Sequence, residues 1–457
     1  MLSSSRHLVP QLSTAVTHSM AKQKKQIKIV VIGAGSISFG RGVLADVLGD
    51  QYMQELNVTL TLVDIDAAAL DRMAKVAELI RQHYGSTVTI EQTTSRRKAL
   101  KGADYVVISV AINRWTLWEQ DYRLPHAHGF KQALGENGGP GSLFHTLRSL
   151  ELLLPICKDV QRICPDALVL NFTNPESRVL MGMNYLTKLE AIGLCHGQLE
   201  SRRWLAERIL QRPLEEIETA AGGLNHFFWV TKIVEKKTGK DLYPLVRQRI
   251  ADDPSLAPPL VRKMVELFGC FTYPSDDHIG EYLSFGAEFT GLKWPYGMEH
   301  RKVPCAGFEP SQNWLEPYIA GEKAPDKDLV QPSGEILADV ITGLELNRRI
   351  WLPAINVLNQ GLYVQNLPED AIVEVPAVAD RRGIAPQHIG PIPEPLAAYC
   401  RTQISIQQLI IEAYRIRSKK LLLQALLLDP VVNSVVNAQK LLDEMLELQA
   451  DYLPKFE

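Results

Sequence analysis

The stretch that decides the fold is Ile27-Lys28-Ile29-Val30-Val31-Ile32-Gly33-Ala34-Gly35-Ser36, an apolar run that ends in two closely spaced glycines. A short apolar run of this kind predicts a strand that is buried on both faces of a parallel sheet. The two glycines allow a sharp turn into a helix and let a phosphate approach the backbone at the helix N-terminus. The stretch therefore predicts the first strand and turn of a dinucleotide-binding fold.

The next strand sharpens this prediction, although Ser38 replaces the third glycine of the usual fingerprint. Residues 58–64 form a second apolar run, and an acidic residue at its end binds ribose hydroxyls and disfavours a 2′-phosphate. The sequence Asp64-Ile65-Asp66 leaves open which carboxylate does this. We predict NAD as the cofactor, and a tight turn without a ligand is the alternative. The residues predicted to bind NAD are Gly33, Gly35, Ser36 and Asp64, with Asn113 and Asn171 at the ends of later strands.

Apolar runs alternate with helical patterns along the first half of the chain. Strands are expected at 27–33, 58–64, 88–90, 105–110, 167–171 and 191–195, and helices at 40–48, 66–84 and 142–163. This alternation predicts right-handed crossovers and a doubly wound sheet. The predicted fold class is α/β, with an N-terminal Rossmann-like doubly wound sheet followed by an α+β lobe for substrate binding and oligomerisation.

The composition changes at about residue 240, where prolines become frequent. After a strand at 227–234 we expect a lobe of helices and long loops. Long apolar-rich helices at 401–427 and 431–448 would either cover the sheet or form a subunit interface. The predicted division is a disordered tail at 1–26, an NAD-binding domain at 27–197 and a catalytic, metal-binding and oligomerisation domain at 198–457. A targeting segment is the alternative for the tail, which contains no Asp or Glu.

Charge and cysteine usage exclude several classes of protein. The net charge of -3 gives no basic field for nucleic acid or an anionic membrane. No run of about 18 apolar residues is present, so no membrane span is expected. The six cysteines show no CxxC spacing, which argues against a zinc knuckle and for a reducing compartment, here the cytoplasm.

Ligands of open α/β sheets bind beyond the carboxyl ends of strands, and four polar clusters are expected at such ends. The clusters are 111–114, 171–175, Cys195-His196-Gly197 and 223–226, and a glycine-rich loop at 135–141 carries Glu136. Taken singly, the two asparagines of 171–175 could cap a helix, Cys195 could be a small buried apolar residue, and His226 could belong to the core. Their shared position favours a site, because a thiolate and an imidazole can hold a transition metal.

These motifs resemble the NAD- and manganese-dependent glycoside hydrolases of family 4. The turn at Gly33-Ala34-Gly35-Ser36, the segment 171–175, Cys195-His196-Gly197 and Asn225-His226 occur in the family's order, and the likeness extends from Lys28 to the C-terminus. The resemblance implies a lactate/malate-dehydrogenase-like fold. It also implies hydrolysis by C3 oxidation, C2 deprotonation, elimination of the leaving group and addition of water, which departs from the two-carboxylate scheme.

The resemblance also implies roles for individual residues. Cys195 and His226 would bind Mn²⁺ or another divalent metal, with substrate oxygens and water completing the shell that Mn²⁺ prefers. The C2 base would be Asp277, with Tyr273 in reserve, and the acid for the leaving oxygen would be His196 or Glu136. The residues expected to bind the sugar are Asn174, Asn225, Arg114 and Arg301, and Arg178 is a further candidate for a sugar carboxylate.

The residues after Cys195 indicate the sugar. In the resembling family Cys-His accompanies unphosphorylated glycosides, and a following glycine is similar to the branch that acts on uronic acids. We therefore expect an α-galacturonidase or α-glucuronidase acting on a small-molecule glycoside, as a homodimer or homotetramer. The alternatives are an α-galactosidase or α-glucosidase of the same family, and a lactate/malate-type NAD-dependent dehydrogenase, which would pair a catalytic histidine with an aspartate and need no metal.

Overall fold

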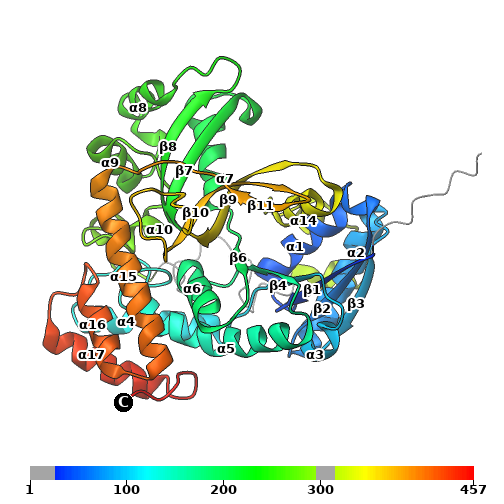
Figure 1. Cartoon of the computed structure of the whole chain (residues 1–457), viewed down its shortest axis with the longest axis horizontal. Coiled ribbons are helices and arrows are strands. Elements are labelled where there is room, and N and C mark those ends of the chain that lie inside the picture. Colours follow the sequence, from blue (N-terminus) through cyan, green and yellow to red (C-terminus); the bar gives the residue numbers. More distant parts are fainter. Residues whose placement is uncertain (1–25, 295–313) are drawn as a thin grey trace, which may run out of the picture.

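A single mixed sheet runs through the computed structural model, which describes residues 26–294 and 314–457 (Figure 1). Across these residues the strand order is β3-β2-β1-β4-β5-β6-β9-β10-β7-β8, and β11 pairs with β10. The first half of the sheet is parallel and the second half is antiparallel. The two halves meet where Gly193 of β6 pairs with Asn356 of β9.

The parallel half confirms the predicted Rossmann-like sheet. Its strands are β1 (Gln26–Ile32), β2 (Asn57–Val63), β3 (Thr89–Thr93), β4 (Tyr105–Ile108), β5 (Leu168–Asn171) and β6 (Ala191–Gly193). Every neighbouring pair among them is parallel. Most residues of these strands are buried, so the strands read in the sequence as near-continuous apolar runs, except for the edge strand β3, which is largely exposed.

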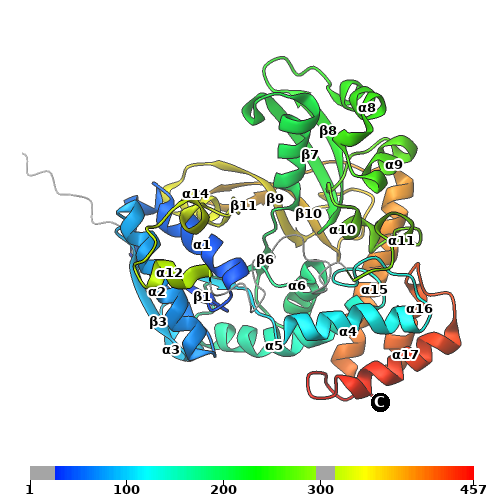
Figure 2. The same ribbon diagram turned by 180° about the vertical axis from the view of Figure 1, so that it is seen from behind.

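Helices cover both faces of the parallel half. One core joins α1 (Ile37–Gly49) and α2 (Ala67–Tyr84) to α12 (Glu316–Ile319) and α14 (Leu337–Leu346), which lie beside them in Figure 2. The opposite core joins α5 (Gly141–Ile163) and α6 (Glu176–Leu186) to the C-terminal helices. The shorter helices between these elements are α3 (Arg96–Ala99), α4 (Arg114–Ala127), α7 (Gly197–Arg203), α8 (Tyr243–Asp252), α9 (Pro259–Phe268), α10 (Asp276–Gly280), α11 (Ala287–Thr290) and α13 (Lys327–Val330).

The antiparallel half confirms the strand predicted at 227–234 and corrects the prediction of helices and long loops after residue 240. Its strands are β7 (Ile217–Leu224), β8 (Phe227–Glu235), β9 (Ile350–Leu358), β10 (Ile372–Asp380) and β11 (Gly383–Pro386). The three that follow residue 240 each contain proline, which hid them in the sequence. Pro376 lies where the register of β9 and β10 shifts, at a β-bulge that tolerates a residue without an N–H donor.

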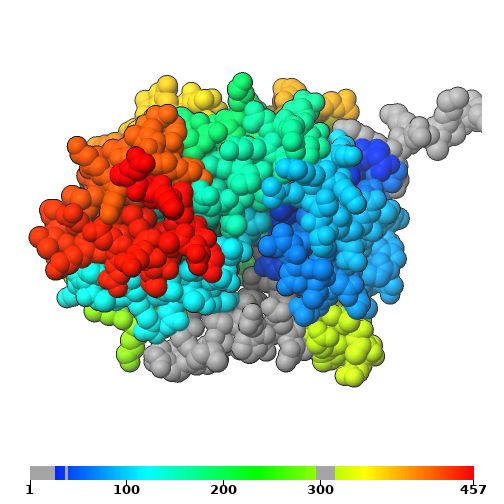
Figure 3. Space-filling view, turned by 90° about the horizontal axis from the view of Figure 1, so that it is seen from below, coloured from blue at the N-terminus to red at the C-terminus, as the bar shows by residue number. Residues whose placement is uncertain are grey.

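The C-terminal helices cover the sheet, and the single long helix predicted at 401–427 is wrong. The chain forms α15 (Glu394–Ile416), α16 (Lys419–Leu428) and α17 (Val435–Leu448). Arg417 has a left-handed backbone that ends α15, and the Ser418 hydroxyl accepts from the Leu421 N–H to begin α16. Figure 3 shows α16 and α17 in red, on the side opposite the blue N-terminal part. Across the described residues, no helix combines the length and apolarity needed to cross a membrane.

Candidate functional site

The turn after β1 has the geometry of a dinucleotide cradle. Gly33 has a φ of 92°, and a Cβ atom there would lie 1.9 Å from the Ser109 carbonyl oxygen of the neighbouring segment. The N–H groups of Gly33 and Ala34 both donate to the Val63 carbonyl, at 2.9 and 3.1 Å. These contacts fix the turn against the ends of β2 and β4. The turn leads into α1 at Ser36, whose N–H donates to the Gly33 carbonyl at 3.3 Å.

The structure separates the two carboxylates that the sequence left open. The Asp64 carboxylate accepts from the Gly35 N–H at 2.8 Å and from the Asp66 N–H at 3.0 Å, so it borders the glycine turn. The Asp66 carboxylate accepts from the N–H groups of Ala68 and Ala69 and caps α2. The turn and Asp64 fit NAD, because glycine leaves room for a pyrophosphate and the carboxylate lies at the end of β2.

The two later asparagines predicted for the cofactor have different surroundings. Asn171 is fully buried, and its amide bonds its own loop through the Thr173 N–H and carbonyl. Asn113 is exposed, has a left-handed φ of 40°, and donates to the Tyr452 hydroxyl at 2.7 Å. Asn171 therefore shapes the loop after β5, whereas Asn113 lies at the surface beside the C-terminal segment.

Cys195 and His226 come from the two halves of the sheet. Cys195 follows β6, as predicted, and is 9% exposed. Residues Asn225 and His226 form the two-residue turn of the β7–β8 hairpin, in which Leu224 pairs with Phe227. His226 has a φ of 61°, an uncommon backbone conformation of the kind that gathers at functional sites. The fourth polar cluster is thus a hairpin tip and not the carboxyl end of a parallel strand.

Tyr273 lies against both residues. Its ring centroid is 5.5 Å from that of His226, and a Cβ atom on Gly197 would contact both the Cys195 Sγ and the Tyr273 ring, at 3.7 and 3.8 Å. Burial, followed by the neighbouring His278, keeps the pKa of His226 well below its usual value, so the imidazole is neutral and has a lone pair to offer. Burial and nearby carboxylates raise the pKa of the Cys195 thiol well above its usual value. A bound cation would reverse that effect.

The donor set fits a divalent metal with open positions. In residues 26–294 and 314–457 no third histidine, cysteine, aspartate or glutamate completes a metal cluster. Two protein ligands leave coordination positions for water and substrate oxygens. The Asn225 Oδ1 atom, which is adjacent along the chain, is buried and has no hydrogen-bond partner. We conclude that Cys195 and His226 suit a metal that shares its shell with substrate.

The residues that orient His226 were missed in the sequence. Asn137 Nδ2 lies 3.2 Å from His226 Nδ1, and Glu281 accepts from the N–H groups of Glu136 and Asn137, at 2.8 and 2.9 Å. A Cβ atom on Gly138 would lie 2.6 Å from the Glu281 carbonyl oxygen, so this loop requires glycine there. The predicted loop at 135–141 was the available signal, but only its carboxylate was singled out.

Two buried carboxylates lie behind Cys195. Glu374 of β10 accepts from Asn225 Nδ2 at 3.0 Å, and Glu176 of α6 accepts from Asn356 Nδ2 at 2.9 Å. Each keeps one carboxylate oxygen without a partner. Burial raises the pKa of Glu374 to about 8, and burial and Glu374 raise that of Glu176 well above its usual value. These groups were also missed, because their segments carried no site motif.

The two candidates for the base differ in their surroundings. Asp277 is one-third exposed and bonds the N–H and Nδ1 of His278, at 2.9 and 3.0 Å. Burial would raise the pKa of Asp277, but bonds from His278 and Ser275 outweigh it and lower the pKa. Tyr273 is 4% exposed, and burial, followed by the nearby Glu200 and Cys195, raises the pKa of its hydroxyl well above the usual value. The Asp277 carboxylate is therefore paired with His278, whereas the Tyr273 ring packs against the His226 ring.

The two candidates for the acid have different surroundings. His196 Nδ1 is 2.9 Å from Glu335 Oε1, a bond that raises the pKa of His196. Glu136 is buried, accepts from Asn137 Nδ2 at 3.3 Å, and pairs with Arg114 Nη2 at 3.3 Å. Each therefore has a charged partner within the site.

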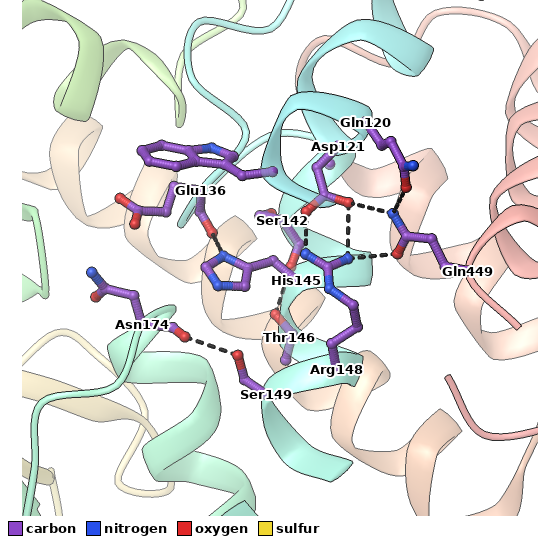
Figure 4. Close-up of polar contacts among 12 residues, drawn as sticks. Gln120, Asp121, Glu136, Ser142, His145, Thr146, Arg148, Ser149, Asn174 and Gln449 are labelled. Carbon is purple, nitrogen blue, oxygen red and sulfur yellow. Dashed lines mark hydrogen bonds and ion pairs between the residues drawn. The ribbon is translucent and has the colours of Figure 1, made fainter. Parts of the chain in front are cut away.

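The residues predicted to bind the sugar have different surroundings, and one of them lies outside the described residues. Figure 4 shows His145 between Glu136 and Asn174, with its Nδ1 3.1 Å from the Glu136 carbonyl oxygen. The Asn174 carbonyl accepts from the Ser149 hydroxyl at 3.0 Å. Arg114 lies over the Trp115 and Trp118 rings, and Arg178 is buried against Gln403. Arg301 lies outside the described residues.

The chain matches one family along most of its length. Residues 28–210 match family 4 glycosyl hydrolase, and residues 221–432 match the family 4 glycosyl hydrolase C-terminal domain. It is 31% identical to an α-glucosidase of Erwinia rhapontici, over 93% of this chain and 98% of that one. It is also 31% identical to an α-galactosidase of Bacillus subtilis strain 168, over 94% and 99%. An α-galacturonidase of the same strain is 28% identical, over 92% and 97%.

Solved structures share the fold. A 6-phospho-α-glucosidase from gut microorganisms, in complex with NAD and Mn²⁺, has a TM-score of 0.81 at 22% identity, over 95% of this chain and 100% of that one. A lactate dehydrogenase from Cryptosporidium parvum has a TM-score of 0.52 at 15% identity, over 86% and 99%. The dehydrogenase likeness confirms the predicted architecture, and the match over both halves decides between the enzyme classes. The chain belongs to glycosyl hydrolase family 4.

Proposed function

We propose that this chain is an α-uronidase, an α-galacturonidase or α-glucuronidase, that binds NAD and a divalent metal, with Mn²⁺ preferred. The observation that supports a uronate as the sugar is the position of the Arg114 guanidinium. A chain of contacts links it to His226, one of the two proposed metal ligands. Arg114 bonds Glu136, Glu136 bonds Asn137, and Asn137 contacts His226. A sugar carboxylate needs a cation at such a place.

NAD and a divalent metal would together supply the chemistry of the proposed hydrolysis. When bound, NAD supplies reversible oxidation of a sugar carbon and the metal supplies Lewis acidity. We propose that Gly33, Gly35, Ser36 and Asp64 form the NAD cradle, with Asn113 and Asn171 beside it, and that Cys195 and His226 hold the metal. NAD and Mn²⁺ in a solved structure of the same fold support both assignments.

The chain's own residues then move protons. We propose Tyr273 as the base that removes the C2 proton, because its ring lies against His226, and Asp277 as the residue that holds His278. His196 donates a proton to the leaving oxygen, since it follows Cys195 and is anchored by Glu335. Glu136 is the alternative acid. Asn174 and Asn225 bind sugar hydroxyls, and the unpartnered Asn225 Oδ1 supports that role.

A substrate panel tests the sugar class. Wild-type protein with NAD, Mn²⁺ and a thiol reductant is assayed on p-nitrophenyl α-galacturonide, α-glucuronide, α-galactoside and α-glucoside. We expect a uronide to be preferred. Arg114→Met should lower kcat/KM for that uronide roughly 10- to 100-fold, the effect of one charge-assisted bond. It should change kcat/KM for the hexosides less than about threefold.

A matched control lies on the same helix. Arg123 is exposed on α4, and among the residues that the structure describes it bonds only Glu119, so Arg123→Met should leave kcat/KM for all four substrates unchanged. Arg114→Lys should retain part of the uronide activity, because it keeps the charge but loses the planar fork. A wild-type preference for a neutral hexoside would contradict the uronidase proposal.

A neutral α-glycosidase is the second candidate. It is favoured by one observation, the higher identity of the α-glucosidase and α-galactosidase relatives, 31% against 28% for the α-galacturonidase. The same panel separates the two, because a neutral α-glycosidase would cleave the hexosides and gain nothing from Arg114.

We also propose a homodimer or homotetramer in the cytoplasm. Exposed apolar side chains on the C-terminal helices support self-association. They are Ile416, Leu427, Leu428, Val435, Val436 and Leu448. Light scattering after size exclusion would test it, and a monomer at micromolar concentration would contradict it. A metal-binding thiolate oxidises readily, so the reducing cytoplasm suits Cys195.

A further inference from the structure

A cavity of about 340 Å³ lies beside His196, between α7 with the π-helix that continues it (Trp204–Leu210) and the loop at Ser333 and Gly334. Its volume is at the lower end of the range for small-molecule sites, roughly 300–1,000 Å³. A π-helix is rare and is often found at functional sites. The proposed function places no ligand in this cavity.

Two residues connect the cavity to the reacting centre. His196 lines the cavity and directly follows Cys195 in the chain. Glu200 also lines it and lies close to Tyr273, whose ring lies against His226. The proposed acid and a neighbour of the proposed base thus share one wall. A group bound in the cavity would meet the site on the side from which the leaving oxygen receives its proton.

The lining combines an aromatic wall with polar side chains of both signs. Trp204 donates from its indole N–H to the Leu256 carbonyl at 2.8 Å, which fixes the ring, and the Arg208 guanidinium covers it. Arg203 and Glu207 are exposed, and neither side chain has a hydrogen-bond or ion-pair partner among the described residues. Two arginines and two glutamates of the lining balance in charge, and Glu335 offsets the charge of His196, which suits a hydroxylated neutral ligand better than an anion.

We propose that this cavity binds the leaving-group sugar of the glycoside, with Arg203 and Glu207 hydrogen-bonded to its hydroxyls and Trp204 as the apolar wall. The inference rests on the proposed function in one respect, that the glycone is bound at Cys195 and His226. It adds a leaving-group specificity, namely a preference for a neutral sugar over an aryl group or a second uronate.

The test compares two substrates that share a glycone and differ in leaving group. One is the p-nitrophenyl α-glycoside, and the other is a disaccharide with a neutral reducing sugar. Arg203→Met and Glu207→Gln should each lower kcat/KM for the disaccharide roughly tenfold, the effect of a lost hydrogen bond to a charged group. They should change kcat/KM for the aryl glycoside less than about twofold. Calorimetric titration of the disaccharide should show the same loss of affinity.

Both variants alter exposed side chains, so the melting temperature should stay at the wild-type value. Arg381→Met is the control, because Arg381 is exposed in the β10–β11 turn and its side chain has no partner among the described residues. Equal losses on both substrates, or no loss on either, would overturn the inference. If wild-type enzyme prefers a neutral glycone, the uronidase proposal fails, and the cavity is tested with that glycone instead.

Discussion

Two buried polar regions of the molecule differ in how completely their hydrogen bonds are satisfied. Around Cys195, buried atoms of Glu176, Glu374 and Asn225 have no partner. In the second region Arg148 bonds Asp121 with two nitrogens, and Gln449 of the C-terminal segment bonds both (Figure 4). None of the three side chains of this second region leaves a buried polar atom unpartnered in the part of the chain that the structure describes.

The difference separates function from architecture. An unpartnered buried polar atom costs free energy of folding, so a cluster of them indicates a site where ligand or metal supplies the missing bonds. The network of Asp121, Arg148 and Gln449 joins α4, α5 and the C-terminal segment. Its hydrogen bonds are satisfied within the protein, so it has no free donor or acceptor for a ligand. Substitutions in the first region should therefore reduce activity and metal binding, whereas substitutions in the second should reduce stability.

The largest effect is expected at the metal pair. Cys195→Ala should lower kcat by about 1,000-fold or more, since metal ions contribute several kcal/mol to such reactions. Mn²⁺ binding, followed by electron paramagnetic resonance, should be lost while the melting temperature of the metal-free protein stays within a few degrees. Metal affinity equal to wild type in this variant would contradict the assignment.

Asp121→Leu should produce the complementary result. It leaves the buried Arg148 guanidinium without its carboxylate, which typically costs about 3–5 kcal/mol of unfolding free energy. Urea denaturation measures the loss, and the double variant Asp121→Leu/Arg148→Met should recover part of it. The folded fraction should keep kcat within a few-fold of wild type. A stable but inactive Asp121→Leu protein would break the comparison.

Asn137→Leu tests the partner of His226. Residues that orient a metal ligand typically contribute 10- to 100-fold to metal affinity. We expect the Mn²⁺ dissociation constant to rise by that factor, with KM for NAD unchanged. Asn57→Leu, at an exposed residue of β2, serves as the control. Unchanged Mn²⁺ affinity in the Asn137 variant would show that the contact to His226 Nδ1 is incidental.

The smallest effect distinguishes Asp64 from Asp66. Asp64→Ala should raise the dissociation constant of NAD roughly tenfold, because a charge-assisted bond is lost. Asp66→Ala should leave NAD affinity unchanged and lower the unfolding free energy by about 1 kcal/mol, since only a helix cap is removed. Fluorescence titration and thermal unfolding measure the two quantities, and a reversed pattern would contradict the assignment.

The parallel half of the fold could be predicted because most of its strands are buried on both faces and leave an uninterrupted apolar signal, although the edge strand β3 is largely exposed. In the antiparallel half only β8 was predicted, since β9, β10 and β11 contain proline and β7 has small residues with weak alternation. The break at Arg417 also left no Gly or Pro signal, because an arginine takes the left-handed position that glycine usually fills.

Candidates for the site could be named where a residue type suggests the chemistry by itself. Cys195, His226 and the glycine turn follow from motifs along the chain, Tyr273 follows from the family resemblance, and the roles of all of them stay predictions. Glu281, Glu374 and Asn137 do not, because their roles arise from contacts between segments far apart in the sequence, as in the bond from Glu281 to the loop at Glu136. Such contacts form only when the chain has folded, so they cannot be predicted from the spacing of residues along the sequence.

The central claim is that this site removes the C2 proton of a glycoside while NAD is reduced and reoxidised within one turnover. The most direct measurement is hydrolysis in D₂O, followed by mass spectrometry and NMR of the released sugar. The account predicts one deuterium at C2, a slower reaction with C2-deuterated substrate, and no accumulation of NADH. Product without deuterium at C2 would contradict it.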